Sequence, residues 1–438
     1  MNIHLKALGC RLNEAELESW ATQFQQAGHQ LVNEARDADL TVLNTCAVTR
    51  EAVRKSRKLI NRVRRESPYG KLVVSGCAVS TGEAGNATDL GIDLLVANNR
   101  KNELVKTVLD TLPINIMPEG ATLPAESALF ARNRQRAFIK IQDGCRYRCS
   151  YCIVTKARGE EQSRSCKEII DQINHLFEEG VQEVVLTGVH VGGYGSDINS
   201  SLTELVQQIL SSTSVPRVRF ASVEPWDLGD NFFTLFANPR LMPHMHLPLQ
   251  SGSNSILRLM SRRCRTEDFA ALVSQARESV SNFNITTDII VGFPGETEQQ
   301  WQETLEFVER IGFGHIHVFS YSPRAGTKAA LMQNQVSETL KKERSAALRK
   351  LADTQRCEFI KKQLGSNARV LWEKQSAHTP KKIQSASECT QRVFGYTENY
   401  TRVCSNASLV PPAGGIGSCL LDRLEPEGRF AWVDLPQT

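Results

Sequence analysis

Residues 143–152 read DGCRYRCSYC and place three cysteines, Cys145, Cys149 and Cys152, in a C-x3-C-x2-C spacing. Such tight spacing is typical of metal sites. A structural zinc site, however, is usually closed by four ligands, and no further cysteine or histidine follows at the expected short interval. A [4Fe-4S] cluster held by three thiolates instead leaves one iron open to a substrate or cofactor. The spacing therefore favours an iron-sulfur site with an open coordination position.

The cysteine loop follows the first of six candidate strands, which alternate with helical patterns. These strands are AFIKIQ (137–142), EVVLTG (183–188), RVRFAS (217–222), HMHLPL (244–249), TTDIIV (286–291) and HIHVFS (315–320). Eight βα units close the complete barrel, so six predict a partial (β/α)6 barrel. The three cysteines then lie on its C-terminal face, where the active sites of such barrels are found.

Upstream, three more candidate strands alternate with two helical patterns, which predicts an α/β unit with a parallel sheet. Cys10, Cys46 and Cys77 follow these strands, which read NIHLKAL, LTVLN and KLVVSG. Because the carboxyl ends of parallel strands share one edge, we expect the three thiols to converge there. A buried structural cysteine would explain any one of these positions, whereas three out of three favour a second cluster.

Downstream, the helical period is lost after a long charged helix that ends at Gly365. Short β-like runs separated by turn residues then predict a small all-β module. We therefore expect an N-terminal domain over residues 1–112, a linker over 113–130, the partial barrel over 131–364 and the all-β module over 365–438.

The composition is that of a soluble globular protein, with 41% hydrophobic and 23% charged residues among 438. No apolar run approaches the roughly 20 residues of a membrane span, and the N-terminus lacks the pattern of a secretory signal, so we expect a cytoplasmic protein. In that reducing compartment the 12 cysteines indicate metal binding or catalysis rather than disulfides. Six of them match no motif and are interpreted as structural or incidental: Cys166, Cys264, Cys357, Cys389, Cys404 and Cys419.

Taken together, these motifs resemble the radical S-adenosylmethionine (SAM) enzymes and, among them, the methylthiotransferases. The resemblance rests on the C-x3-C-x2-C loop and on five further segments: GCRLNEAELES (9–19), NTCAVT (44–49), SGCA (75–78), HLPLQSGS (246–253) and TTDIIVGFPGET (286–297). It implies two [4Fe-4S] clusters. Cys145, Cys149 and Cys152 would hold the cluster that binds and cleaves SAM. Cys10, Cys46 and Cys77 would hold an auxiliary cluster, where an exogenous sulfur is methylated before transfer.

The resemblance also implies a SAM site on the rim of the barrel, at the ends of successive strands. For each position alone, a turn glycine or a polar cap is the favoured interpretation, and only their shared placement on one rim favours SAM binding. Thr155 stands where many relatives have proline, which concerns the course of the loop and not the cysteines. The residues expected to contact SAM are Tyr151, Thr187, Gly188, Ser222, Glu224, Gln250, Val291 and Gly292.

Two segments point to RNA. The all-β module, with GYTENYTRV at 395–403, resembles the TRAM domain, a small RNA-binding barrel, and predicts RNA contacts from Tyr396, Tyr400 and Arg402. The helical stretch 50–65 holds eight basic residues and one acid, which favours phosphate contact over a merely solvated face. The residues expected to contact RNA on this helix are Arg54, Lys55, Arg57, Lys58 and Arg62. The net charge of +4 is by itself only a weak indication.

The segment CAVTREAVRKSR (46–57) most resembles the branch that adds methylthio to C2 of N6-threonylcarbamoyladenosine at position 37, beside the tRNA anticodon. The expected partners are then the tRNA anticodon stem-loop, a reducing electron donor and a sulfur donor, with no membrane. Sister enzymes act on N6-isopentenyladenosine in tRNA or on an aspartate of a ribosomal protein, and both stay open as alternatives. A non-catalytic iron-sulfur RNA-binding regulator is the alternative from another class.

Overall fold

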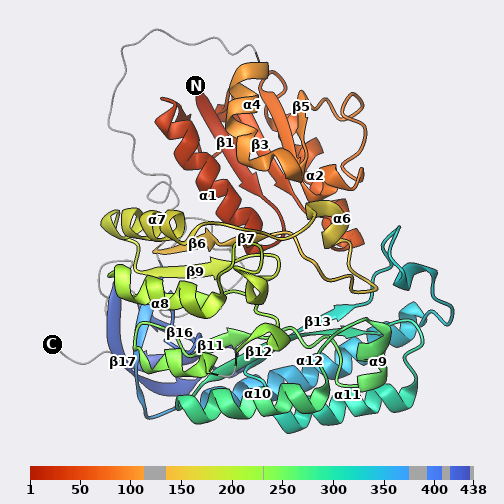
Figure 1. Cartoon of the computed structure of the whole chain (residues 1–438), viewed down its shortest axis with the longest axis vertical. Coiled ribbons are helices and arrows are strands. Elements are labelled where there is room, and N and C mark those ends of the chain that lie inside the picture. Colours follow the sequence, from red (N-terminus) through yellow and green to blue (C-terminus); the bar gives the residue numbers. More distant parts are fainter. Residues whose placement is uncertain (113–134, 230, 374–391, 407–414, 435–438) are drawn as a thin grey trace, which may run out of the picture.

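The computed structural model describes residues 1–112, 135–229, 231–373, 392–406 and 415–434. It contains an N-terminal sheet with its helices, a partial barrel and a small closed C-terminal barrel, which follow one another along the chain (Figure 1). The linker expected over 113–130 and Cys389 lie outside the described residues. Among the residues described, no helix combines the length and the apolarity that crossing a membrane requires.

The N-terminal sheet is entirely parallel, in the order β2-β1-β3-β4-β5, which confirms the predicted α/β unit. Apolar residues alternate along its strands, so Val42 and Val73 pack under α1 and α4, whereas Leu43 and Val74 pack under α2. The strands are β1 (Asn2–Ala7), β2 (Gln30–Leu31), β3 (Leu40–Thr45), β4 (Lys71–Gly76) and β5 (Leu94–Val96), and the helices are α1 (Arg11–Gln26), α2 (Arg50–Glu66), α3 (Cys77–Ser80) and α4 (Leu104–Thr111).

All six predicted barrel strands are present and run parallel. They form two three-stranded sheets that meet through a bridge between Ser222 and His246, and the barrel stays open between β6 and β13. The strand at 244 is shorter than expected because Pro248 has no N–H to donate. The strands are β6 (Arg136–Lys140), β9 (Glu183–Thr187), β10 (Arg217–Phe220), β11 (His244–His246), β12 (Asn284–Val291) and β13 (His315–Ser320).

Helices cover the outside of the partial barrel and bury most of its apolar core (Figure 1). A two-stranded hairpin of β7 (Gln142–Asp143) and β8 (Gln162–Ser163) flanks the cysteine loop. The helices are α6 (Val154–Arg158), α7 (Cys166–Glu178), α8 (Leu202–Ser212), α9 (Asn254–Leu259), α10 (Thr266–Ser279), α11 (Glu298–Ile311) and α12 (Glu338–Lys361).

The C-terminal module is a closed barrel in the order β14-β15-β16-β18-β17, which confirms the small all-β prediction. It docks against the amino ends of the partial-barrel strands. There Arg217 Nη2 donates to Arg369 O at 2.6 Å, and Asn284 Nδ2 donates to Asn399 O at 2.8 Å. Its strands are β14 (Asn367–Trp372), β15 (Arg392–Tyr396), β16 (Arg402–Asn406), β17 (Ile416–Leu424) and β18 (Ala431–Asp434).

Candidate cluster and substrate site

Cys10, Cys46 and Cys77 converge at the carboxyl edge of the N-terminal sheet. A Cβ placed on Gly9 would lie 2.8 Å from Cys46 Sγ, so only glycine fits beside this thiol. Gly76, with φ of 107°, likewise has no room for a side chain, because a Cβ there would lie 2.2 Å from Thr45 O. Burial raises the pKa of Cys46 to about 11, and the charges of Cys10 and Cys77 act on the same thiol. The three sulfurs therefore form one group.

Cys145, Cys149 and Cys152 lie on the loop after β6, as the sequence predicts. The backbone N–H of Val154 points to Cys152 Sγ at 3.4 Å, and the Cys152 N–H donates to Cys149 O at 3.0 Å, which curls the loop around the thiols. Burial raises the pKa of Cys152 to about 11, with smaller contributions from Cys149 and from Cys77 of the other set. The two sets of cysteines thus lie within electrostatic range of each other.

Arg262 is a half-buried cation beside the second set. Its side chain hydrogen-bonds to Cys149, and its guanidinium lies 4.3 Å from the centre of the Trp226 ring. Positive charge and N–H donors near sulfur stabilise thiolates and cluster sulfurs. The sequence analysis missed Arg262 because it stands among several arginines in SRRCR (261–265), where no spacing distinguishes one from the next.

His190 forms a second polar network behind the same loop. Its Nδ1 contacts Glu161, and its Nε2 lies 2.6 Å from Asp227 Oδ2, which also accepts a hydrogen bond from Tyr147 at its other oxygen, at 3.0 Å. Although burial opposes the charge, the hydrogen bond to Asp227, the charge of Glu224 and the hydrogen bond to Glu161 raise the pKa of His190. The network ties the Cys145 loop to the ends of β9 and β10.

The residues expected to contact SAM all lie on the C-terminal rim of the barrel. Thr187 and Gly188 end β9, and Ser222 and Glu224 follow β10. Glu224 is half-buried, desolvation raises the pKa of its carboxyl, and its Oε2 lies 3.8 Å from His190 Nε2 but has no hydrogen-bond partner among the described residues. The remaining residues complete the rim: Tyr151 in the cysteine loop, Gln250 after β11, and Val291 and Gly292 at the end of β12.

One cavity of about 930 Å³ connects the three parts of the molecule. Its lining runs from Cys10 in the N-terminal part, past Thr187 and Ser222 on the rim, into the partial barrel and down to Arg402 of the C-terminal barrel. Five arginines and four histidines line it, against one acid, Asp288. The cavity is thus suited to a polar or anionic ligand that reaches both rim and interior.

Comparisons with known proteins agree with this site. The chain matches the Radical SAM superfamily over residues 139–308 and the Uncharacterized protein family UPF0004 over residues 2–96. It is 34% identical to the threonylcarbamoyladenosine tRNA methylthiotransferase MtaB of Thermotoga maritima (85% of this chain, 86% of the relative) and 33% identical to that of Chlamydia pneumoniae (98% and 97%). The chain belongs to the radical SAM methylthiotransferase family.

A sister branch of this methylthiotransferase family matches almost as well. The tRNA-2-methylthio-N(6)-dimethylallyladenosine synthase of Oceanobacillus iheyensis is 33% identical over 88% of this chain and 77% of its own length. Among solved structures, the radical SAM methyltransferase TsrM from Kitasatospora setae, with cobalamin and a [4Fe-4S] cluster bound, shares the fold with a TM-score of 0.57 at 14% identity, over 75% of this chain and 77% of its own.

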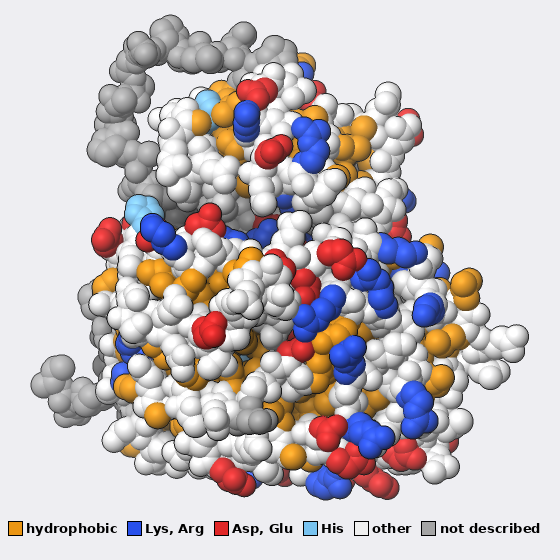
Figure 2. All heavy atoms as spheres, viewed as in Figure 1, with side chains coloured by type: hydrophobic (Ala, Val, Ile, Leu, Met, Phe, Trp, Pro, Cys, Tyr) orange, Lys and Arg blue, Asp and Glu red, His pale blue; other side chains and the backbone are white. Residues whose placement is uncertain are grey.

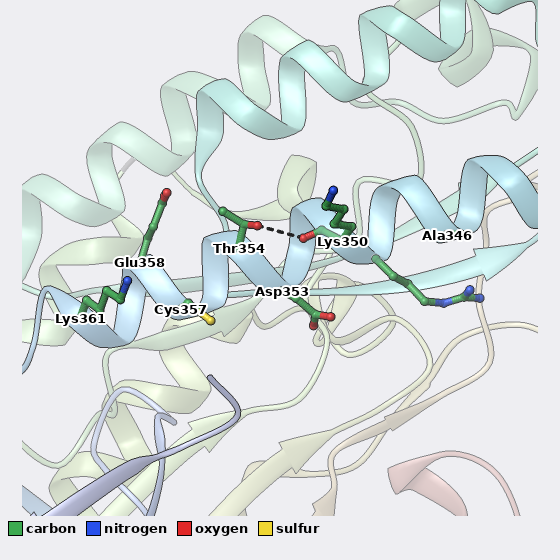
Figure 3. A pocket seen from close by; sticks show the side chains of 8 residues that line it. Ala346, Lys350, Asp353, Thr354, Cys357, Glu358 and Lys361 are labelled. Carbon is green, nitrogen blue, oxygen red and sulfur yellow. Dashed lines mark hydrogen bonds between the residues drawn. The ribbon is translucent and has the colours of Figure 1, made fainter. Parts of the chain in front are cut away.

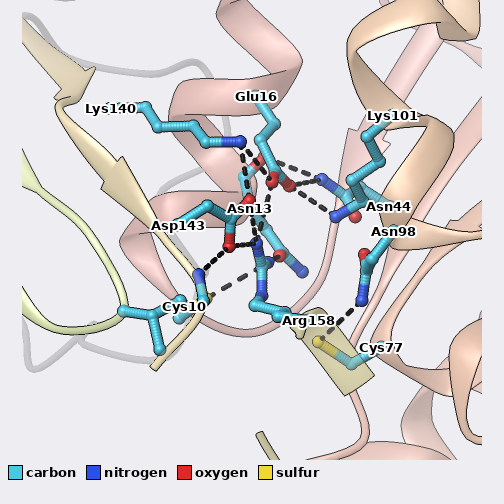
Figure 4. Close-up of polar contacts among 12 residues, drawn as sticks. Cys10, Asn13, Glu16, Asn44, Cys77, Asn98, Lys101, Lys140, Asp143 and Arg158 are labelled. Carbon is cyan, nitrogen blue, oxygen red and sulfur yellow. Dashed lines mark hydrogen bonds and ion pairs between the residues drawn. The ribbon is translucent and has the colours of Figure 1, made fainter. Parts of the chain in front are cut away.

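A buried ionic network joins the two cysteine sets of this methylthiotransferase (Figure 4). Arg158 Nη1 lies 2.9 Å from Glu16 Oε1 and 2.9 Å from Asp143 Oδ1, and Arg158 Nη2 donates to Asn13 Oδ1 at 2.8 Å. Lys101 Nζ lies 2.6 Å from the other oxygen of Glu16. Asn13 is three residues after Cys10 and Asp143 is two before Cys145, so the network fixes one loop against the other.

The residues expected to bind RNA divide into two groups. Those of α2 (Arg54, Lys55, Arg57, Lys58 and Arg62) are all exposed, and Figure 2 shows Lys and Arg side chains gathered on the right of one face, around and below the junction of the upper and lower parts. Tyr396 and Tyr400 instead stack on each other at 4.6 Å, and the Arg136 guanidinium lies 5.2 Å from each ring. These two rings therefore support the joint between the barrels and also line the cavity together with the exposed Arg402, so their contact with RNA stays a prediction.

Among the described residues, the unassigned cysteines make no hydrogen bond to either set. Cys264, Cys404 and Cys419 are buried, and Cys166 is half-buried at the start of α7. Cys357 lies on α12 beside a shallow hollow lined by residues of that helix (Figure 3), and its Sγ is 3.7 Å from Gly428 O. None of these contacts links an unassigned cysteine to a residue that lines the cavity.

Proposed function

We propose that this methylthiotransferase adds a methylthio group to C2 of N6-threonylcarbamoyladenosine at position 37 of tRNA, using two [4Fe-4S] clusters and SAM. The observation that carries the proposal is the pairing of two three-thiol sets, which lie within electrostatic range of each other and whose loops are joined by the buried Arg158 network, with Cys10 of the first set lining the cavity. A single cluster would serve electron transfer or sensing, whereas transfer of sulfur to an unactivated carbon needs a radical source and a sulfur source in one place.

The residues present fit both clusters. Each set supplies three soft thiol ligands, which leaves one iron open. Nitrogen donors already surround the sulfurs: Asn98 Nδ2 lies 3.6 Å from Cys77 Sγ, and Val154 and Arg262 serve the second set. Such outer hydrogen bonds orient cluster ligands and tune their potential. When bound, the two clusters and SAM supply a 5′-deoxyadenosyl radical and a methylthio group for transfer.

The chain's own residues bind the substrate and shield the reaction. The two edge strands of the open barrel carry Phe138 and Phe319, both of which line the cavity, and Phe319 is 45% exposed. An exposed aromatic face at the mouth of a cavity is suited to stacking an extruded base. The cationic lining of the cavity and the exposed basic residues of α2 supply the charge that attracts the anticodon stem-loop.

The finer assignments belong to the same proposal. The rim residues would hold SAM, and Arg402 would extend the RNA surface of a TRAM-like C-terminal barrel. The proposal also includes domain boundaries at residues 112, 130 and 364. It further includes a cytoplasmic location and separate donors of electrons and sulfur. Overall identity separates the threonylcarbamoyl and dimethylallyl branches by only about one percentage point, so the choice of substrate rests on the polar cavity.

The test is anaerobic reconstitution followed by analysis of tRNA nucleosides. The reconstituted chain is expected to convert SAM to 5′-deoxyadenosine, and cells lacking it should lose the methylthio group from threonylcarbamoyladenosine alone. Loss from dimethylallyladenosine instead would assign the sister branch. Tight tRNA binding without any cleavage of SAM would favour the non-catalytic regulator.

A further inference from the structure

Three polar side chains from adjacent strands meet on the inner wall of the cavity. His246 of β11, Asp288 of β12 and His317 of β13 each offer a ligand atom, and these atoms lie within 4.8 Å of one another. Asp288 and His317 are partners in the parallel register, so both project from the same side of the sheet. None of its three residues belongs to either set of cysteines or to the expected SAM contacts, and the cluster adjoins the rim, because the Gln250 N–H donates to Asp288 O at 2.8 Å.

The two imidazoles of this cluster differ in their hydrogen bonding: both nitrogens of His246 have partners, and those of His317 have none among the described residues. His246 Nδ1 lies 3.0 Å from Thr286 Oγ1, and its Nε2 lies 3.1 Å from Asp288 Oδ1, so both of its nitrogens are used. The His317 side chain is exposed to the cavity and makes no hydrogen bond to any part of the chain that the structure describes; its ring contacts only those of His246 and His315 there. His317 is therefore available to a ligand.

The surroundings give the available groups complementary roles. The charge and the hydrogen bond of His246, against the opposing effect of burial, lower the pKa of Asp288, whose second oxygen has no partner among the described residues and can accept a hydrogen bond. Arg11, one residue after Cys10, also lines the cavity, and its charge acts on His317. The wall thus offers one anionic acceptor beside a neutral donor and a cation.

A threonylcarbamoyl substituent matches this arrangement. It has N–H and O–H groups that donate and a carboxylate that accepts, whereas a dimethylallyl substituent has neither. We propose that Asp288 and His317, with Arg11 at the mouth, form the subsite that recognises the threonylcarbamoyl group of the substrate adenosine. The inference rests on the proposed function and deepens it, because it names the residues that select this substrate.

The position of the subsite agrees with the length of the substituent. His317 lies two residues before Phe319 on β13, which separates the two positions by about 7 Å at roughly 3.3 Å per residue. The terminal oxygens of the substituent lie five bonds beyond N6, a reach of at most roughly 7 Å at about 1.4 Å per bond. A base stacked on Phe319 near the rim, with its substituent directed into the barrel, therefore brings the polar atoms to His317.

The same geometry explains how the alkyl substrate is rejected. A dimethylallyl group would bury Asp288 and His317 against its alkyl surface without replacing the hydrogen bonds that they make to water, and polar groups left unpaired on binding are a strong source of discrimination between ligands. The cavity wall therefore acts by exclusion as well as by attraction.

The experiment measures binding of three synthetic anticodon stem-loops to the reconstituted chain, carrying adenosine, threonylcarbamoyladenosine or dimethylallyladenosine at the modified position. The unaltered chain should prefer the threonylcarbamoyl stem-loop to the adenosine one by at least about tenfold, the effect of one charge-assisted hydrogen bond. His317→Leu should reduce that preference to within about twofold by weakening binding of the threonylcarbamoyl stem-loop more than binding of the adenosine one. His317→Gln, which keeps a donor, should recover part of it.

His175→Leu is the matched control, because His175 is an exposed imidazole on α7 and does not line the cavity. A full preference in His317→Leu would overturn the inference while methylthiolation by the unaltered chain still stands. Methylthiolation of dimethylallyladenosine alone would instead contradict the proposed function. The three donors also suit a divalent cation, so loss of one metal equivalent in His317→Leu, with both clusters retained, would overturn the subsite in favour of a metal site.

Discussion

Arg158 Nη1 lies 2.9 Å from Glu16 Oε1, and this contact connects the partial barrel to the first helix of the N-terminal part (Figure 4). Both side chains are almost fully buried, at 2% and 4% exposure. Lys101 and Lys140 also pair with Glu16, so three cations surround one carboxylate. The distance between the two cysteine sets is therefore fixed by charged groups that cannot separate without exposing an unpaired ion.

Replacing Arg158 by methionine should destabilise the chain by about 3–5 kcal/mol, because Glu16 and Asp143 then lose a buried partner. Thermal unfolding of the cluster-free protein measures this loss. Arg148→Met is the matched control, since Arg148 pairs with Glu160 on the surface at 57% and 68% exposure and should cost at most about 1 kcal/mol. Equal losses in the two variants would contradict the bridging role of Arg158.

The same network predicts a dependence of stability on acid. Although burial acts in the opposite direction, Lys101 and Arg158 hold the pKa of Glu16 well below its ordinary value of 4.5. A lowered pKa contributes stability above the unfolded value, and that stability is lost as the pH falls below about 4.5 toward the folded pKa. The melting temperature should therefore drop more steeply between about pH 4.5 and pH 3 in the unaltered chain than in Glu16→Gln. If the melting temperatures of the two proteins fell by the same amount over this pH range, the lowered pKa of Glu16 would make no contribution to stability.

The local patterns predicted the strands well because each has a regular apolar alternation. β2 and β5 were missed because strands of two and three residues are too short to show a period. The positions of Cys10, Cys46 and Cys77 after successive strands were readable because parallel strands share an edge. The parallel topology therefore brings residues that are distant in the sequence to one edge of the sheet.

Partners distant in the sequence were not readable in the same way. Arg158 contacts Glu16, which is 142 residues away in the sequence, and Arg262 contacts Cys149 from another loop. No sequence spacing predicts either contact. Tyr396 and Tyr400 show the same limit, since the motif predicts stacking on bases, which stays a prediction, whereas it does not indicate that the two rings stack on each other at the joint between barrels. Composition identifies the residue type, and docking of the parts decides what it contacts.

The basic face of α2 predicts a salt-dependent contribution to tRNA binding. Lys58 has no ion pair among the described residues, and Lys55 has only a long contact of 3.7 Å to Glu51. The double change Lys55→Gln with Lys58→Gln should weaken binding and reduce the slope of log affinity against log salt by about 0.7–0.9 for each phosphate that the helix no longer neutralises. The same changes at Lys350 and Lys361 of α12 are the control. An unchanged slope in the α2 variant would exclude phosphate binding there.

Gly9 predicts a way to separate the two clusters. A Cβ at this position would lie 2.6 Å from Cys46 Cβ and 2.8 Å from its Sγ, so Gly9→Ala should displace Cys46 and leave the second set intact. Iron content should fall from about eight to about four atoms per chain, and methylthiolation should fall about 10- to 100-fold while SAM is still cleaved. Gly28→Ala controls for backbone strain, because Gly28 also has a positive φ (82°) but no atom within 4 Å of the added Cβ. If the control lost as much iron, strain alone would account for the effect, and the close fit of Gly9 against Cys46 would have no part in holding the auxiliary cluster.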